Sequence, residues 1–228
     1  MSTLADNLST IRARITEGAQ AAGRDPASVH LLAVSKTKPA SAIREVHAAG
    51  VRNFGENYLQ EALTKQQQLG DLPLIWHFIG PIQSNKTKAI AEHFDWVHSV
   101  DRLKIAQRLS EQRPAGLAPL NICLQVNVSG EDSKAGCAPT DLPALAEAIA
   151  ALPNLQLRGL MAIPEPTEDR TAQEAAFARL RQLQEGLGLD LDTLSMGMSH
   201  DLEAAIAQGA TWVRIGTALF GARDYGNA

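Results

Sequence analysis

The feature that most constrains the fold of this chain is an alternation of short apolar segments with amphipathic helical segments. The apolar segments are rich in β-branched residues, and each is followed by apolar residues at helical spacing. We predict strands at residues 30–35, 51–54, 74–79, 96–99, 120–127, 155–161, 193–196 and 211–215. We predict intervening helices at 39–49, 56–69, 84–92, 101–112, 140–151, 169–186 and 200–208. An extra helix is expected at 3–22, before the first strand.

This alternation favours parallel strands, because a parallel connection needs a crossover. Eight strand–helix units predict a closed (β/α)8 barrel, the TIM barrel, with an extra N-terminal helix. A doubly wound open sheet is the alternative that the pattern leaves open. The 228 residues suit one such barrel, and no Pro-, Gly- or Ser-rich linker divides them. We therefore expect a single α/β domain over residues 1–228.

Composition excludes several classes of function. The net charge is −4 and aromatic residues are 4%, which gives no basis for nucleic-acid binding. No apolar run approaches the roughly 20 residues needed to span a bilayer, and the N-terminus does not resemble a signal peptide. Cys123 and Cys137 form no CxxC pair and no metal-like cluster. We therefore expect a cytoplasmic protein without a metal or a membrane partner.

Lys36 stands at the end of the first predicted strand, where the sites of parallel barrels lie. Desolvation at the barrel mouth would lower the pKa of this lysine. A neutral amine can attack a carbonyl carbon and form a Schiff base. The alternative interpretation is a lysine whose ammonium extends to the solvated rim.

Two small-residue turns follow the last two predicted strands. Ser195-Met-Gly-Met-Ser199 precedes a predicted helix, where backbone N–H groups and the Ser199 hydroxyl can hold a phosphate. Arg214-Ile-Gly216-Thr217 forms the second turn, and the loops after strands seven and eight are the recurrent phosphate site of these barrels. A phosphorylated aldehyde would satisfy both the lysine and the turns, and pyridoxal 5′-phosphate (PLP) is the predicted cofactor. Arg214 would face the pyridine nitrogen and leave it unprotonated, unless it forms a salt bridge at the rim.

Six stretches of the sequence match, in order, a known family. They are LAVSKTKP at 32–39, NFGENY at 53–58, WHFIGPIQSNK at 76–86, GLMAI at 159–163, LSMGMS at 194–199 and VRIGTALFG at 213–221. With these stretches the sequence closely resembles the pyridoxal phosphate homeostasis proteins, also called the PLPBP or YggS/PROSC family. The resemblance implies a barrel like the N-terminal domain of fold-type III enzymes such as alanine racemase.

The resemblance also implies the roles of individual residues. Lys36 would carry PLP as an internal aldimine, Ser199, Gly216 and Thr217 would hold the phosphate, and Arg214 would face the ring nitrogen. The other cofactor-binding residues that it implies are Asn57, His77 and Met161.

The function implied by the resemblance is PLP binding in intracellular vitamin B6 homeostasis and delivery, without a defined catalytic turnover. Apo-enzymes that require PLP would be the recipients, and we expect a monomer. In the racemases that resemble this barrel, a second domain supplies a tyrosine as the opposite base. Because the chain ends soon after the last predicted strand, we expect no such domain here. Its two tyrosines are Tyr58, expected at the start of a helix, and Tyr225, expected in the tail.

Two other functions remain open from the sequence. The first is a small PLP-dependent amino-acid racemase or lyase that uses Lys36 as its base. The second is a cofactor-free phosphate-binding isomerase with Glu56 and His77 as bases. Lys134, in the polar loop 130–136, is a candidate second acceptor for the aldehyde during release, or else an ordinary exposed loop lysine.

Overall fold

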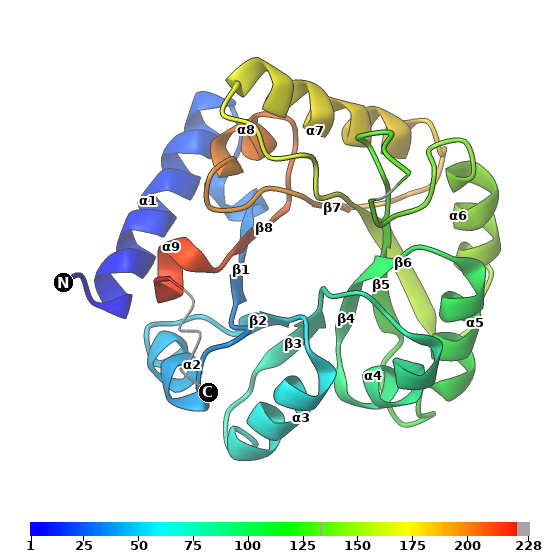
Figure 1. The fold of residues 1–228 in the computed structure, drawn as a ribbon, viewed down its shortest axis with the longest axis horizontal. Coiled ribbons are helices and arrows are strands. Elements are labelled where there is room, and N and C mark those ends of the chain that lie inside the picture. The colour runs from blue at the N-terminus through cyan, green and yellow to red at the C-terminus, as the bar shows by residue number, and fades with distance from the viewer. Residues whose placement is uncertain (133, 223–228) are drawn as a thin grey trace.

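The computed structural model describes residues 1–132 and 134–222, and within them it shows a closed barrel of parallel strands (Figure 1). The strands are β1 (His30–Val34), β2 (Asn53–Glu56), β3 (Ile75–Phe78), β4 (Trp96–Val100), β5 (Leu120–Gln125), β6 (Leu155–Met161), β7 (Thr193–Ser195) and β8 (Trp212–Ile215). They pair in sequence order, and β8 closes the barrel on β1 with His30 opposite Trp212. The predicted TIM barrel is confirmed, and the open sheet is excluded.

Helices cover the outside of the barrel (Figure 1). They are α1 (Leu4–Ala21), α2 (Ala40–Ala48), α3 (Leu59–Gln68), α4 (Thr87–His93), α5 (Leu103–Gln112), α6 (Leu142–Ala150), α7 (Arg170–Glu185), α8 (Leu202–Ala207) and α9 (Thr217–Phe220). The predicted helix 84–92 begins instead as a 3-10 turn, Ser84–Lys86, before α4. The short helix α9 was not predicted from the sequence, because four residues are too few to show a helical period. None of the helices in the described ranges is long and apolar enough to cross a membrane.

The predicted extra helix, α1, packs beside α8 and α9 on the barrel wall (Figure 1). It begins at a capping box, in which the Thr3 and Asp6 side chains each accept a hydrogen bond from the other's backbone N–H. Its Arg14 guanidinium pairs with both carboxylate oxygens of Glu203 on α8, at 2.6 and 2.8 Å. The Arg14 contact ties α1 to α8, the helix that follows the predicted phosphate turn after β7.

The buried apolar side chains form two clusters. The larger lies between the strands and the helices. The smaller lies inside the barrel and consists of Leu32, Val34, Ile79, Trp96, Cys123, Met161 and Trp212. Because side chains alternate along a strand, a single strand can contribute to both clusters, as β1 does with Ala33 in the larger cluster and Leu32 and Val34 in the smaller one. The inner cluster fills the barrel below the carboxyl ends of the strands and forms a packed floor under the mouth.

Candidate functional site

A cavity of about 180 Å³ lies at the carboxyl ends of β1, β7 and β8. Six of the eight residues predicted to bind the cofactor line it, namely Lys36, Asn57, Ser199, Arg214, Gly216 and Thr217. Sequence reasoning missed the other lining residues, which are Val34, Ile79, Ile163, Met198 and His200. The strand alternation could have indicated two of them, because Val34 and Ile79 lie two residues before Lys36 and after His77.

Lys36 reaches the cavity because of the alternation along β1. Leu32 and Val34 both point into the barrel, where they belong to the inner cluster. Lys36 is the next residue of the same alternation and lies just beyond the end of the strand. Its side chain is half-buried at the mouth, and Val34 lines the cavity beside it. The Lys36 amine therefore lies at the inner rim of the barrel, beside the cavity.

The two predicted phosphate turns lie side by side. The Ser199 hydroxyl oxygen accepts a hydrogen bond from the N–H of Ala218 at 3.3 Å, which ties the loop after β7 to the start of α9. Gly216 is the N-cap residue of α9, and Thr217 is its first residue. Gly197 has φ +99°, and a Cβ placed there would lie 2.6 Å from the Ala205 Cβ, so this turn requires glycine.

Arg214 presents a buried guanidinium to the same cavity. Its Nη1 donates to the Ser195 hydroxyl oxygen at 2.8 Å, and its Nη2 donates to the Ala162 carbonyl oxygen at 3.0 Å. Burial lowers the pKa of Arg214 to about 10, which still leaves the group charged at neutral pH, and the carboxylate of Asp201 opposes this shift. These hydrogen bonds leave Arg214 as an oriented, charged donor at the base of the cavity.

Ser195 continues this contact as a chain of hydrogen bonds across the barrel interior. Its hydroxyl oxygen lies 2.7 Å from His98 Nδ1, His98 Nε2 lies 2.8 Å from His77 Nδ1, and His77 Nε2 lies 2.9 Å from Asn53 Oδ1. The amide oxygen of Asn53 can only accept, so His77 donates from Nε2 and accepts at Nδ1. His98 then donates from Nε2 and accepts the Ser195 proton at Nδ1. Every donor in the chain therefore points away from Arg214.

Both imidazoles of this chain are neutral. Burial lowers the pKa of His98 to about 3, and the charge of Arg214 lowers it further in the same direction. Burial also lowers the pKa of His77 well below 6.5, and the neighbouring His98 adds to the shift. Arg214 therefore carries the only positive charge of the five linked groups.

His77 and Met161, the other two predicted residues, are not among those that line the cavity. Both are fully buried in the barrel interior, one layer below. The His77 ring stacks on Trp96 with centroids 5.4 Å apart, and Met161 packs in the inner cluster. Glu56 is also fully buried and bonded to Lys65, so the acid–base pair of the isomerase hypothesis does not face the cavity.

The residues around the cavity fit a small molecule with an aldehyde, a ring nitrogen and a phosphate. They offer an amine, a guanidinium, two hydroxyls and the backbone of α9. The Asn57 Oδ1 atom is buried and has no hydrogen-bond partner within the described part of the chain. Leaving such an atom unpaired costs about 1–3 kcal/mol, so it favours a polar ligand group here. No group of three His, Cys, Asp or Glu residues that could hold a metal ion is found in residues 1–132 and 134–222.

A second cavity of about 240 Å³ adjoins the first. Ile163, Met198, His200 and Arg214 line both cavities. Lys134 lines only the second cavity, and Lys36 lines only the first. The two lysines therefore lie on different cavities that share one arginine.

Known proteins resemble this chain over nearly its whole length. The family model described as alanine racemase, N-terminal domain, matches residues 6–224. A pyridoxal phosphate homeostasis protein of Pseudomonas aeruginosa is 80% identical over 226 residues, which cover 99% of this chain and 98% of that protein. The structure of PipY from Synechococcus elongatus with PLP bound is 43% identical, with a TM-score of 0.85 over 96% of this chain and 100% of that one. An alanine racemase of Corynebacterium glutamicum, 19% identical, shares the fold with a TM-score of 0.67 over 97% of this chain and 63% of that one.

Proposed function

The chain belongs to the pyridoxal phosphate homeostasis proteins, which are built on the alanine racemase N-terminal domain, and we propose that its cavity binds PLP for intracellular PLP homeostasis and delivery. One observation carries this proposal. Lys36, Arg214 and the two small-residue turns, which are far apart in the sequence, line a single cavity of about 180 Å³. The PLP that is bound in the 43% identical PipY supports it.

Each residue has a role in this proposal. When bound, PLP supplies an aldehyde for attachment and a ring that can accept electrons. Lys36 holds the aldehyde carbon as a Schiff base, while Ser199, Gly216 and Thr217 bind the phosphate. Arg214 donates to the ring nitrogen. The remaining residues have supporting roles, Asn57 as a polar partner in the cavity, and His77 and Met161 from the layer beneath it.

A carrier fits the cavity better than a two-base racemase does. The guanidinium of Arg214 keeps the ring nitrogen unprotonated, which weakens the ring as an electron sink. Of the described residues that line the two cavities, none is a tyrosine. Tyr58 is exposed, and Tyr225 lies outside the described residues. We therefore propose binding and release without catalytic turnover, in the cytoplasm.

Release needs a path away from Lys36. The cavity lined by Lys134 adjoins the first one and shares Arg214 with it. We propose that the Lys134 amine would add to the Schiff-base carbon and the Lys36 amine would leave, so that PLP would be held transiently on Lys134 before it passes to an apo-enzyme. The side chains of Ile163 and Met198, which line both cavities, are exposed at this mouth.

The test is the visible absorption spectrum of the purified protein with PLP, before and after borohydride reduction. The Schiff-base band should appear, and reduction should fix the cofactor on the peptide that contains Lys36. Lys36→Ala should abolish the band, whereas the matched control Lys38→Ala should keep it. A wild-type protein that shows no band with added PLP would overturn the cofactor assignment.

A second measurement separates a carrier from an enzyme. The PLP-loaded protein is incubated with a panel of amino acids in deuterated water, and exchange of the α-proton is followed by NMR. A carrier should leave the α-proton in place. Exchange that disappears in Lys36→Ala would establish a racemase or lyase instead.

A further inference from the structure

A buried ion cluster lies directly behind the β1–β2 edge that carries Lys36. Its centre is Lys65 on α3, which is 5% exposed. The Nζ of Lys65 lies 2.7 Å from Glu56 Oε1, 2.6 Å from Glu61 Oε1 and 2.7 Å from the carbonyl oxygen of Ser35. An ammonium group has three protons to donate, so Lys65 is fully engaged in this cluster.

The cluster holds the backbone on both sides of Lys36. The Ser35 carbonyl oxygen belongs to the peptide group before Lys36, and it accepts from Lys65. The Thr37 N–H belongs to the peptide group after Lys36, and it donates to Glu61 Oε1 at 2.6 Å. The Ser35 hydroxyl also donates to Glu56 Oε1 at 2.8 Å. Both peptide groups that flank the Lys36 Cα are therefore bonded to charged side chains of the same cluster.

This backbone needs to be held. The last ladder hydrogen bond of this edge runs from Ser35 N–H to the Gly55 carbonyl oxygen at 3.0 Å. Two residues later, Thr37 has φ +64°, a left-handed conformation that L-residues other than asparagine and aspartate rarely adopt. A turn bond runs from the Lys38 N–H to the Ser35 carbonyl oxygen, and the cluster adds hydrogen bonds to the backbone on both sides of Lys36.

The cluster is also electrostatically specific. It combines one cation with two carboxylates, and burial raises the pKa of Glu56 while the Lys65 charge opposes that rise. Glu56 Oε2 is buried and has no hydrogen-bond partner among the residues that the structure describes. Burying a carboxylate in this way carries a large desolvation penalty, and apolar side chains of similar volume would fill the same space without that penalty. A buried ion cluster is weak evidence for stability, whereas its hydrogen bonds reach the backbone on both sides of Lys36.

We propose that Lys65, Glu61 and Glu56 are positioning residues, which fix the peptide groups around Lys36 so that its amine meets the aldehyde of bound PLP. This inference rests on the proposed function of Lys36 as the Schiff-base lysine. It extends that function to three residues outside the cavity. Their contribution is to covalent attachment, and phosphate binding at Ser199 and Thr217 does not depend on them.

The experiment compares two ligands in the full-length protein. Schiff-base formation with PLP is followed by absorbance, and binding of pyridoxine 5′-phosphate, which lacks the aldehyde, is followed by calorimetry. Glu61→Gln keeps the shape of the side chain but replaces a charge-assisted hydrogen bond with a weaker neutral one. We expect this variant to weaken Schiff-base formation about tenfold while pyridoxine 5′-phosphate affinity changes less than about twofold.

The matched controls come from an exposed pair on α4, Lys88 and Glu92, whose side chains also stand at i and i+4. Glu92→Gln should leave both ligands unaffected. Lys65→Met should weaken Schiff-base formation more strongly than Glu61→Gln, and circular dichroism checks that it folds. Glu61→Gln remains the deciding variant if Lys65→Met does not fold.

Each outcome decides a different point. If Glu61→Gln forms the Schiff base like the wild type, or loses both ligands equally, the positioning role is overturned. If the wild type itself gives no adduct that borohydride can trap, the proposed function fails first, and the positioning role fails with it.

Discussion

The Nδ1 atom of His77 lies 2.8 Å from the Nε2 atom of His98, and both imidazoles are fully buried inside the barrel. Neither ring can take up a second proton without losing an acceptor of the chain that runs from Arg214 to Asn53. Protonation of either ring would therefore break a hydrogen bond beneath the cavity. The free energy of unfolding should then depend on pH, which can be measured.

The first prediction concerns acid stability. The pKa of His98 falls to about 3 in the folded protein, and that of His77 falls well below 6.5. The unfolded chain binds protons at these histidines below pH 6.5, whereas the folded protein does not, so the free energy of unfolding decreases as the pH falls. Between pH 7 and pH 5 each histidine should remove about 2 kcal/mol. Urea denaturation at several pH values measures this slope.

The variant His98→Gln isolates one of the two contributions. From pH 7 to pH 5, the free energy of unfolding of the variant should decrease by about 2 kcal/mol less than that of the wild type. This difference does not depend on the stability of the variant at pH 7. The pKa of Glu56 is raised, so its effect on the free energy of unfolding is opposite: its stabilising contribution is lost as the pH rises. This effect is the same in the wild type and the variant, so it cancels when the two are compared. His93→Gln, at a half-exposed site, serves as the control. Equal slopes in the wild type and His98→Gln would contradict the prediction.

The second prediction concerns Ser195, which connects Arg214 to His98. Ser195→Ala leaves two buried groups without their partner and should cost about 1–3 kcal/mol of unfolding free energy. Because Arg214 is then less well oriented, we also expect PLP affinity to fall roughly fivefold. Ser110→Ala removes a buried hydroxyl that bonds to Pro153 on the outer layer. This control should lose stability without losing PLP affinity, and a similar affinity loss in both variants would refute the link.

The third prediction separates phosphate binding from attachment. Ser199 lines the cavity and joins the loop after β7 to α9. Ser199→Ala should lower the affinity for PLP about tenfold, because one phosphate hydrogen bond is lost. The affinity for pyridoxal, which has no phosphate, should stay unchanged. Absorbance titration measures the dissociation constants of PLP and pyridoxal. An equal loss of affinity for both would show that Ser199 does not bind the phosphate.

The fourth prediction tests the turn after β7. Gly197 combines φ +99° with a Cβ position 2.6 Å from Ala205, whereas Gly188 has φ +65° and open space around its Cβ position. Gly188→Ala should therefore lower the free energy of unfolding only by the cost of a left-handed backbone conformation, about 1–2 kcal/mol. Gly197→Ala should cost at least about 2 kcal/mol more, since a packed core tolerates added atoms poorly. Thermal denaturation compares them, and equal shifts would show that the turn can move.

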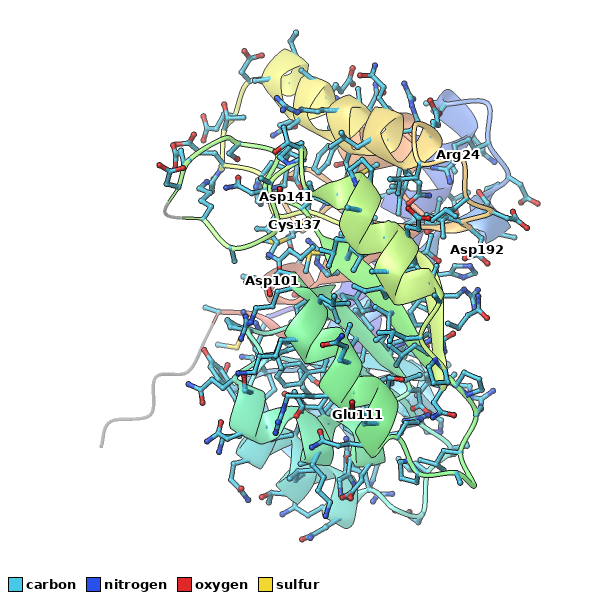
Figure 2. The ribbon with its side chains drawn as sticks, turned by 90° about the vertical axis from the view of Figure 1, so that its right-hand side faces the viewer. Arg24, Asp101, Glu111, Cys137, Asp141 and Asp192 are labelled. Atoms are coloured by element: carbon cyan, nitrogen blue, oxygen red, sulfur yellow. The ribbon has the colours of Figure 1, made fainter. Side chains whose placement is uncertain are left out.

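The fifth prediction concerns the two cysteines. Burial raises the pKa of Cys123 to about 12 and that of Cys137 to about 11. Asp101 and Asp141, which lie near Cys137, add to its shift (Figure 2). Because the thiolate is the reactive form, neither residue should react with iodoacetamide at pH 8 in the folded protein, and both should react in guanidinium. Mass spectrometry after a short exposure distinguishes the two states, and native alkylation of Cys137 would show that its loop opens.

The barrel and most of the cavity could be predicted from the sequence, because both depend on local patterns. Strand and helix periods identify the eight units, and parallel closure brings all carboxyl ends to one face. Residues in the loops that follow the strands, such as Lys36 and Ser199, therefore come together at this face and line one cavity. Element ends were less certain, as the 3-10 start of α4 and the short β7 show.

The layer beneath the cavity could not be predicted in this way. His77 was expected among the cofactor-binding residues, yet the structure places it one layer down, between Asn53 and His98. Its depth depends on how the strands are staggered around the closed barrel, which no single strand reveals. The same holds for the bond between His98 and Ser195, which are 97 residues apart.

The sequence by itself thus determined the fold, the family and the chemical groups at the barrel mouth, since these follow from residue type and spacing along one chain. Only the tertiary structure decided which groups hold them in place. Lys65 on α3 binds the carbonyl oxygen of Ser35, which lies 30 residues earlier in the sequence. Arg214 is held by a hydrogen-bond chain that joins five strands, β8, β7, β4, β3 and β2. Hydrogen-bond partners are fixed by distances of about 3 Å, and closure of the barrel sets those distances.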